Sequence, residues 1–139
     1  MKFLYVCKSN FARSQMAEVF HNSITKNKEA ESAGINPSIF EGKKLGSFSK
    51  QEATILVMKE AGYDISKNKS KRIKKEMVKN YDKIIVMASP EIWPKYLNNN
   101  KKVEYWDIED PRGKSIEKFR EVRDKIKIKV KNLIENLKD

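Results

Sequence analysis

Short apolar segments alternate with longer helical segments along this chain, and this alternation constrains its fold more than any other feature. Four segments have the length and apolar content of buried strands, at residues 2–7, Glu31–Ile35, Lys83–Met87 and Val103–Trp106. Strands that alternate with helices form a parallel sheet with helices packed on both faces. The sequence therefore predicts an α/β fold, a three-layer sandwich built on a four-stranded parallel sheet.

Helical periodicity and end signals place the expected helices. The first and the last have apolar side chains at helical spacing. A capping-box pair, Ser49 with Glu52, starts the second, and Ser89 before Pro90 has the pattern of a helix N-terminus in the third. The expected helices span residues 13–27, 49–62, 89–97 and 115–137.

The only cysteine of the sequence lies in the loop between the first strand and the first helix. Five residues separate Cys7 from Arg13, and Ser14 follows directly. A tight loop that leads into a helix offers backbone N–H groups and positive potential to a tetrahedral oxyanion, and an arginine adds a two-pronged donor. The same potential favours the thiolate form of a cysteine. We therefore interpret Cys7 as a nucleophile, in preference to a buried cysteine that only fills space at the end of a strand.

A carboxylate after the last strand is the second candidate for chemistry. A thiolate that attacks phosphorus needs a positioned acid to protonate the leaving oxygen. Asp110 suits that role because it precedes Pro111, which disfavours helix at the residue before it. Asp107 and Glu109 are rivals that spacing alone does not rank, and a plain turn is the alternative. Ligands bind at the carboxyl ends of parallel strands, so we expect the Cys7 loop and Asp110 at the same edge of the sheet.

With these two elements in view, the sequence resembles the low-molecular-weight tyrosine phosphatases and the arsenate reductases that share their fold. The resemblance covers essentially the whole chain, and it implies one phosphatase-like domain over residues 1–139 with sheet order 2-1-3-4. The matching residues are Cys7 to Ser14, Met16-Ala17-Glu18, Ser32-Ala33-Gly34, Tyr81 to Met87, and Trp106 through Asp110-Pro111.

The resemblance also implies a role for each site residue. Cys7 would be the nucleophile, Arg13 the clamp on the transition state and Asp110 the general acid. Ser14 would stabilise the thiolate and Asn10 would brace the loop, a role that suits asparagine because it tolerates the left-handed backbone region. No metal and no cofactor are expected. The expected substrate-binding residues are Lys8, Ser9, Asn10, Phe11, Ala12 and Ser14.

Four positions distinguish this chain from parts of the family. Many members have a second cysteine, able to form a protective disulfide with the nucleophile, where this chain has Ala12. Phosphoarginine-selective members have threonine in place of Phe11. Tyrosine phosphatases often have aromatic residues after Asp-Pro, where this chain has Arg112 and Gly113. Substrate selection is therefore expected to differ from that of phosphoarginine-selective relatives and of many tyrosine phosphatases.

Two catalytic functions of the family are open at this point. Reductases coupled to thioredoxin need two further cysteines after the third strand, where this chain has Met87-Ala88-Ser89. We therefore expect a cysteine-dependent phosphomonoester hydrolase of the low-molecular-weight tyrosine phosphatase type, which acts through a cysteinyl-phosphate intermediate. The alternative is an arsenate reductase that uses an external thiol or redoxin.

Charge and composition limit the partners and the cellular location that we expect. The net charge is +11, from 30 Lys and Arg against 19 Asp and Glu. Such a surface attracts anions and can bind nucleic acid without sequence preference, so a non-catalytic anion- or nucleic-acid-binding module is a second alternative. The expected partner is a phosphorylated protein or small phosphomonoester, or arsenate with an external thiol, and specific nucleic-acid binding is not expected. The single cysteine and the lack of a long apolar run predict a cytoplasmic protein without a membrane span.

Overall fold

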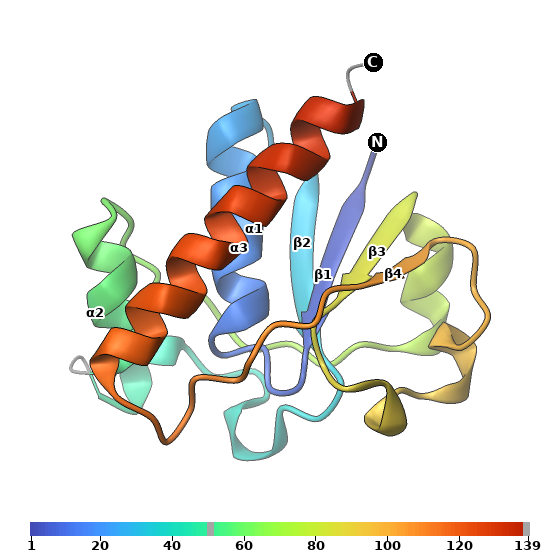
Figure 1. Cartoon of the computed structure of the whole chain (residues 1–139). Coiled ribbons are helices and arrows are strands. Elements are labelled where there is room, and N and C mark those ends of the chain that lie inside the picture. Colours follow the sequence, from blue (N-terminus) through green and yellow to red (C-terminus); the bar gives the residue numbers. More distant parts are fainter. Residues whose placement is uncertain (50–51, 138–139) are drawn as a thin grey trace.

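The four expected strands form one parallel sheet in a computed structural model that describes residues 1–49 and 52–137. The strands are β1 (Phe3–Cys7), β2 (Ala30–Gly34), β3 (Lys83–Val86) and β4 (Val103–Tyr105), in the order β2-β1-β3-β4. Figure 1 shows the loops that follow β1 and β4 at the same end of the sheet. The predicted three-layer α/β fold and its strand order are confirmed.

Strand β1 lies at the centre of the fold because its residues are apolar on both faces. All five are buried, and their side chains alternate between two cores. Phe3, Tyr5 and Cys7 belong to the larger core, while Leu4 and Val6 belong to the smaller one. The strand pairs in parallel with β2 and β3, so that Cys7 lies opposite Gly34 at its carboxyl end. The candidate nucleophile is thus fixed by the best-buried strand of the sheet.

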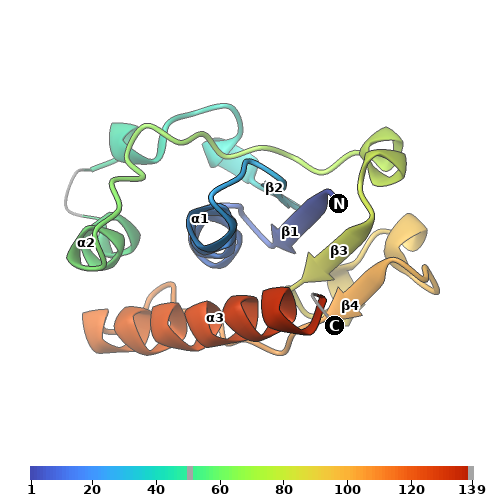
Figure 2. The same cartoon turned by 90° about the horizontal axis from the view of Figure 1, so that it is seen from above.

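The two faces of the sheet are covered by different kinds of helix. The three α-helices lie on the face of the larger core, as Figure 2 shows. The last of them, α3 (Ile116–Leu137), buries an apolar stripe of the kind that the spacing of its apolar residues predicts. Two short 3₁₀ helices, η3 (Lys75–Asn80) and η5 (Lys95–Leu97), contribute side chains to the smaller core on the other face. The α-helices are α1 (Arg13–Thr25), α2 (Ala53–Glu60) and α3 (Ile116–Leu137). The 3₁₀ helices are η1 (Ser38–Phe40), η2 (Leu45–Ser47), η3 (Lys75–Asn80), η4 (Pro90–Ile92) and η5 (Lys95–Leu97).

Two expected helices differ from the structure. The helix expected from residue 89 to 97 is wrong: it is split into η4 and η5, because Trp93 before Pro94 is extended, at φ −67° and ψ 137°. The helix expected from residue 49 is α2, which begins only at Ala53, and Glu52 is its N-cap residue without a side-chain capping bond. Lys50 and Gln51 of that prediction lie outside the described residues. None of the described helices is long and apolar enough for a membrane span.

Candidate active site

A hydroxyl group contacts the sulfur of Cys7 at the start of α1. The Ser14 Oγ lies 3.0 Å from the Cys7 Sγ, and both side chains are buried. The Nδ2 of Asn10 donates to the same Oγ at 2.8 Å. Because that bond occupies a lone pair of the hydroxyl oxygen, the Ser14 proton is free to point at the sulfur. Ser14 is therefore placed to donate a hydrogen bond to the Cys7 sulfur.

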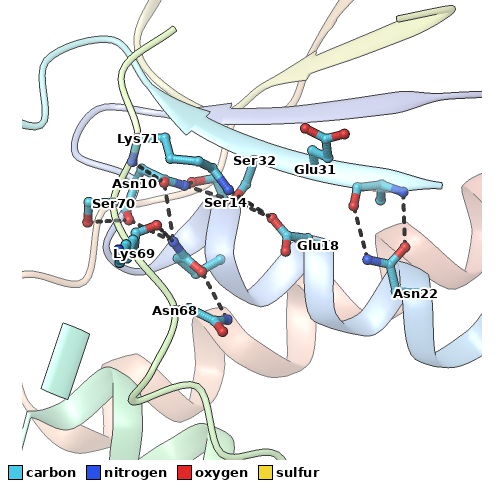
Figure 3. Close-up of polar contacts among 12 residues, drawn as sticks. Asn10, Ser14, Glu18, Asn22, Glu31, Ser32, Asn68, Lys69, Ser70 and Lys71 are labelled. Atoms are coloured by element: carbon cyan, nitrogen blue, oxygen red, sulfur yellow. Dashed lines mark hydrogen bonds and ion pairs between the residues drawn. The ribbon is translucent and has the colours of Figure 1, made fainter. Parts of the chain in front are cut away.

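Asn10 holds the loop in shape through bonds to three separate segments of the chain (Figure 3). Its backbone is in the left-handed region, at φ 55°. The second Nδ2 proton goes to Ser32 Oγ at 2.9 Å, and Ser32 donates in turn to the Glu18 carboxylate at 2.6 Å. The Lys71 amide donates to Asn10 Oδ1 at 2.8 Å, and Ser70 Oγ donates to the Asn10 carbonyl at 2.9 Å. Both polar atoms of the Asn10 side chain are thus hydrogen-bonded, and these bonds require its Nδ2 group to face Ser14.

Arg13 joins the loop to the ends of β3 and β4. Its Nη1 donates to the Met87 carbonyl at 2.6 Å and to the Ile108 carbonyl at 2.9 Å. Its Nη2 lies 3.6 Å from Asp110 Oδ2, and the arginine side chain is only 7% exposed. Two carbonyl bonds to one nitrogen anchor the guanidinium and leave its other nitrogens available to a bound oxyanion.

Asp110 lies beside Arg13 and is held by the next turn of the chain. Its Oδ1 accepts the backbone N–H of Arg112 at 3.1 Å, and its side chain is 41% exposed. The rival Asp107 accepts the Tyr105 hydroxyl at 3.1 Å instead. Asp110 is therefore the carboxylate that shares a pocket with Cys7, and its exposure leaves room for a leaving group or a water.

Glu109, the other rival, forms ion pairs on the surface. Lys114 donates a hydrogen bond to it, and Lys118 forms a second ion pair. The Lys114 hydrogen bond lowers the pKa of the Glu109 carboxyl. A carboxylate kept ionised in this way is poorly suited to donate a proton at neutral pH.

A small pocket brings most of the predicted site residues together. Its walls are Cys7, Ser9, Phe11, Ala12, Arg13, Asp110 and Arg112. Lys8 is directed elsewhere and lines a neighbouring groove of about 300 Å³, which Asp107 and Glu109 also line. Asn10 and Ser14 are completely buried behind the pocket. Their position fits a bracing role, and neither of them lines the pocket.

Three bracing contacts were not predicted from the sequence. In the sequence, Ser32 is only part of a tripeptide that resembles the family, and no pattern marks Ser70 or Lys71 as site residues. All three contact Asn10 from positions at least 22 residues away in the chain, so no local pattern predicts them.

Within residues 1–49 and 52–137, no group of three or more His, Cys, Asp and Glu side chains is arranged to hold a metal ion.

Comparisons with known proteins agree with this geometry. The family model described as "Low molecular weight phosphotyrosine protein phosphatase" matches residues 2–139. The chain is 34% identical to a glutaredoxin arsenate reductase of Synechocystis sp. (strain ATCC 27184 / PCC 6803 / Kazusa), covering 96% of this chain and 95% of the relative. It is 32% identical to an arsenate reductase of Staphylococcus aureus (strain Newman), covering 92% of each.

A solved structure extends the similarity to the whole fold. The low molecular weight protein tyrosine phosphatase from T. tengcongensis superimposes with a TM-score of 0.80 at 29% identity, covering 98% of this chain and 99% of that one. The resemblance stated from the sequence is thereby confirmed. This chain belongs to the low molecular weight phosphotyrosine protein phosphatase family, and it is an enzyme of that family.

Proposed function

We propose that this protein hydrolyses phosphomonoesters through a cysteinyl-phosphate intermediate, as a low-molecular-weight tyrosine phosphatase does. One observation carries the proposal: Cys7, Arg13 and Asp110 line the same small pocket. A nucleophile, an anion clamp and an acid are together the groups that such a hydrolysis requires. The sequence contains no second cysteine that could resolve a thiol adduct within the same chain.

In the first step the Cys7 thiolate attacks phosphorus. A sulfur–phosphorus bond forms, and the bond from phosphorus to the ester oxygen breaks. Asp110, protonated at the start, gives its proton to the departing oxygen, so that an alcohol or phenol leaves. Arg13 and the loop amides bind the equatorial oxygens and stabilise the charge that gathers on them.

In the second step water replaces sulfur on phosphorus. Asp110 is now a carboxylate and accepts a proton from the attacking water, and the sulfur–phosphorus bond breaks. The Ser14 hydroxyl, 3.0 Å from the sulfur, donates a hydrogen bond that stabilises the thiolate as it leaves. Inorganic phosphate is released, and Asp110 ends the cycle protonated as it began.

The test is hydrolysis of phenyl phosphate by three variants. Cys7→Ser is expected to abolish turnover, and Asp110→Asn to lower kcat by between about a hundredfold and ten-thousandfold, the usual contribution of a general acid. Asp107→Asn is the matched control, because it neutralises a carboxylate of the adjoining groove, and its kcat should stay within about threefold of the parent value.

A change of leaving group sharpens this test. Nitrophenyl phosphate releases a more acidic phenol that needs less help from a proton donor. The loss caused by Asp110→Asn should therefore be smaller with nitrophenyl phosphate than with phenyl phosphate. Equal losses with both substrates would remove Asp110 from the acid role, and an undiminished rate in Cys7→Ser would reject the mechanism.

Arsenate reduction with an external thiol is the second candidate. Its support is that the two curated relatives described above, at 32% and 34% identity, are arsenate reductases. Cys7 would attack arsenate and displace water from it. One external thiol would then attack the Cys7 sulfur, releasing arsenite and leaving a mixed disulfide. A second thiol would free Cys7, so that two thiols supply the two electrons.

A coupled assay separates the two candidates. Arsenate is offered with glutathione, glutaredoxin and glutathione reductase, or with thioredoxin and its reductase, and the oxidation of NADPH is followed. Turnover that depends on Cys7 and exceeds phenyl phosphate hydrolysis would favour the reductase. No turnover with either donor, beside clear phosphatase activity, would eliminate it.

A further inference from the structure

Arg112 lies at the rim of the catalytic pocket in a position fixed by aromatic side chains. Its guanidinium carbon is 4.7 Å from the ring centre of Phe40 and 5.9 Å from that of Phe11. Its Nη1 is 3.4 Å from Ser9 Oγ. The arginine thus bridges the loop after β4, the Cys7 loop and η1, although its side chain is exposed to solvent.

Both ends of this residue are held before any ligand arrives. The rings beneath the guanidinium form a cluster, in which the centres of Phe11 and Phe40 are 4.8 Å apart and those of Phe40 and Phe48 are also 4.8 Å apart. The backbone N–H of Arg112 donates to Asp110. A cation stacked on aromatic faces has already given up much of its rotamer freedom, so that a ligand need not order it.

The charge of Arg112 has no carboxylate partner within the described residues. Other basic side chains do have carboxylate partners. The pairs are Arg13 with Asp110, Lys114 with Glu109, and Arg72 with Glu41. Glu52 lines the same cavity of about 180 Å³ as Arg112, but the two form no ion pair. Of the five N–H donors of the guanidinium, the only hydrogen bond found in the described part of the chain is the one to Ser9.

The position of Arg112 separates its role from that of Arg13. Arg13 is buried and anchored to two carbonyls beside Cys7, where the transferred phosphoryl group would bind. Arg112 shares the pocket but stands at its exposed rim, where the rest of the substrate would emerge. A fixed, unpaired guanidinium is suited to bind a carboxylate or phosphate through its two-pronged donors.

We propose that Arg112 forms a second anion-binding site on the leaving-group side of the pocket, so that the preferred substrates are phosphomonoesters with a further carboxylate or phosphate group near the ester. The substrate preference in this inference rests on the proposed hydrolase function, whereas anion binding by Arg112 does not. The opposing view is that Arg112 only covers the aromatic cluster. In that case its loss would affect stability and leave ligand preference unchanged.

Binding of phosphonates tests the proposal without requiring turnover. Benzylphosphonate is compared with its 3-carboxy and 4-carboxy derivatives by titration calorimetry. The parent protein is expected to bind at least one carboxylated isomer about fivefold more tightly than benzylphosphonate, the gain of an exposed ion pair. Arg112→Gln should remove this preference, and Arg112→Lys should keep part of it while losing the two-pronged geometry.

Lys43→Gln is the matched control. Lys43 stacks on Phe48 of the same aromatic cluster, 5.8 Å from the ring centre, but lines neither the small pocket nor the cavity that contains Glu52. Its loss removes one positive charge from the same aromatic cluster and should leave the preference intact. Thermal unfolding of each variant shows whether the fold is kept.

The outcomes separate the two proposals. Equal affinity of the parent protein for all three phosphonates, or a preference that survives Arg112→Gln, would overturn the role of Arg112. A preference that disappears in Arg112→Gln and persists in Lys43→Gln supports it. A preference of that kind in a protein that hydrolyses no phosphomonoester would refute the proposed function and leave the anion site standing.

Discussion

At the residue scale, the hydroxyl beside the Cys7 sulfur is held by an amide group that does not contact the sulfur. Asn10 donates to Ser14 Oγ and leaves the Ser14 proton available to the sulfur, and Ser32 and Lys71 determine which way the Asn10 amide is turned. The chemical group that acts and the group that orients it are therefore different residues. This division explains how a loop with completely buried Asn10 and Ser14 can serve a pocket that those side chains do not line.

His21 makes a residue-scale prediction about pH and stability. It is fully buried, with Nδ1 2.7 Å from the Tyr5 hydroxyl and Nε2 2.8 Å from Glu29 Oε1. Burial lowers its pKa below the ordinary 6.5, although Glu29 acts in the opposite direction. The unfolded chain therefore takes up a proton at a higher pH than the folded one. The free energy of unfolding should fall as pH decreases below about 6.5, down to the folded-state pKa, with a slope of at most about 1.4 kcal/mol per pH unit.

Urea unfolding between pH 5 and 8 measures this slope. His21 is the only histidine of the sequence, so His21→Gln should flatten the curve in that range. Glu29→Gln is the control: it removes the partner that raises the pKa but keeps the imidazole, and the slope should persist. A parent curve that is already flat between pH 5 and 6.5 would show that His21 titrates alike in both states.

At the scale of elements, the end of β2 and the loop after β1 approach each other too closely for a side chain. A Cβ added to Gly34 would lie 2.8 Å from the Asn10 nitrogen and 2.9 Å from the Lys8 oxygen. Both contacts are with backbone, which cannot move aside as a flexible side chain would. Gly34→Ala should therefore displace the loop and lower kcat/KM for phenyl phosphate by more than about tenfold, since small misplacements of catalytic groups are costly.

The control for this prediction is Gly46→Ala. A Cβ there would be 3.0 Å from Ser66 atoms, which is also crowded but outside the catalytic loop. It should lower stability without changing affinity for inorganic phosphate, whereas Gly34→Ala should weaken that affinity at a temperature where both variants are folded. Unchanged phosphate affinity in Gly34→Ala would mean that the loop tolerates the added methyl group.

Most elements could be predicted from local patterns, and the errors have local causes. The stripe of α3 and the buried run of β1 are periodic signals that tertiary packing reinforces. Pro94 breaks the helix expected over residues 89–97, because a proline favours extended backbone at the residue before it. The late start of α2 shows that the Ser49 and Glu52 pattern is not enough to place a helix end.

The candidate site was only partly readable from the chain. Cys7 and Arg13 follow from residue type and from the rule that ligands bind at the carboxyl ends of strands, whereas only the family resemblance distinguishes Asp110 from Asp107 and Glu109. The anchoring of Arg13 by Met87 and Ile108 joins residues 74 and 95 positions apart through carbonyl groups, which every residue has. No side-chain pattern can encode such a bond, so only the folded structure reveals it.

At the scale of the whole molecule, the choice between hydrolysis and reduction depends on groups outside the shared pocket. A pocket with thiolate, guanidinium and carboxylate suits either oxyanion, and phosphate and arsenate are similar in shape and charge. The difference between the two activities is the source of electrons. In this sequence that source must be another molecule, because Cys7 is its only cysteine.

The presence of a single cysteine also predicts how the protein responds to peroxide. A reactive cysteine is first oxidised to a sulfenic acid, which a neighbouring thiol can trap as a disulfide before further oxidation. Here the pocket has Ala12 beside Cys7, so the acid is expected to proceed to forms that dithiothreitol does not reduce. Activity after prolonged peroxide treatment should recover only in part, and bound phosphate should protect it.

Ala12→Cys is the matched variant, because it places a second thiol in the pocket and should recover more fully under the same treatment. Complete recovery of the parent protein would contradict the expectation. Without such a partner, no disulfide within the chain can protect the sulfur, and each molecule oxidised beyond the sulfenic acid is permanently inactive. A cell that depends on this enzyme would have to restore lost activity by synthesising new protein.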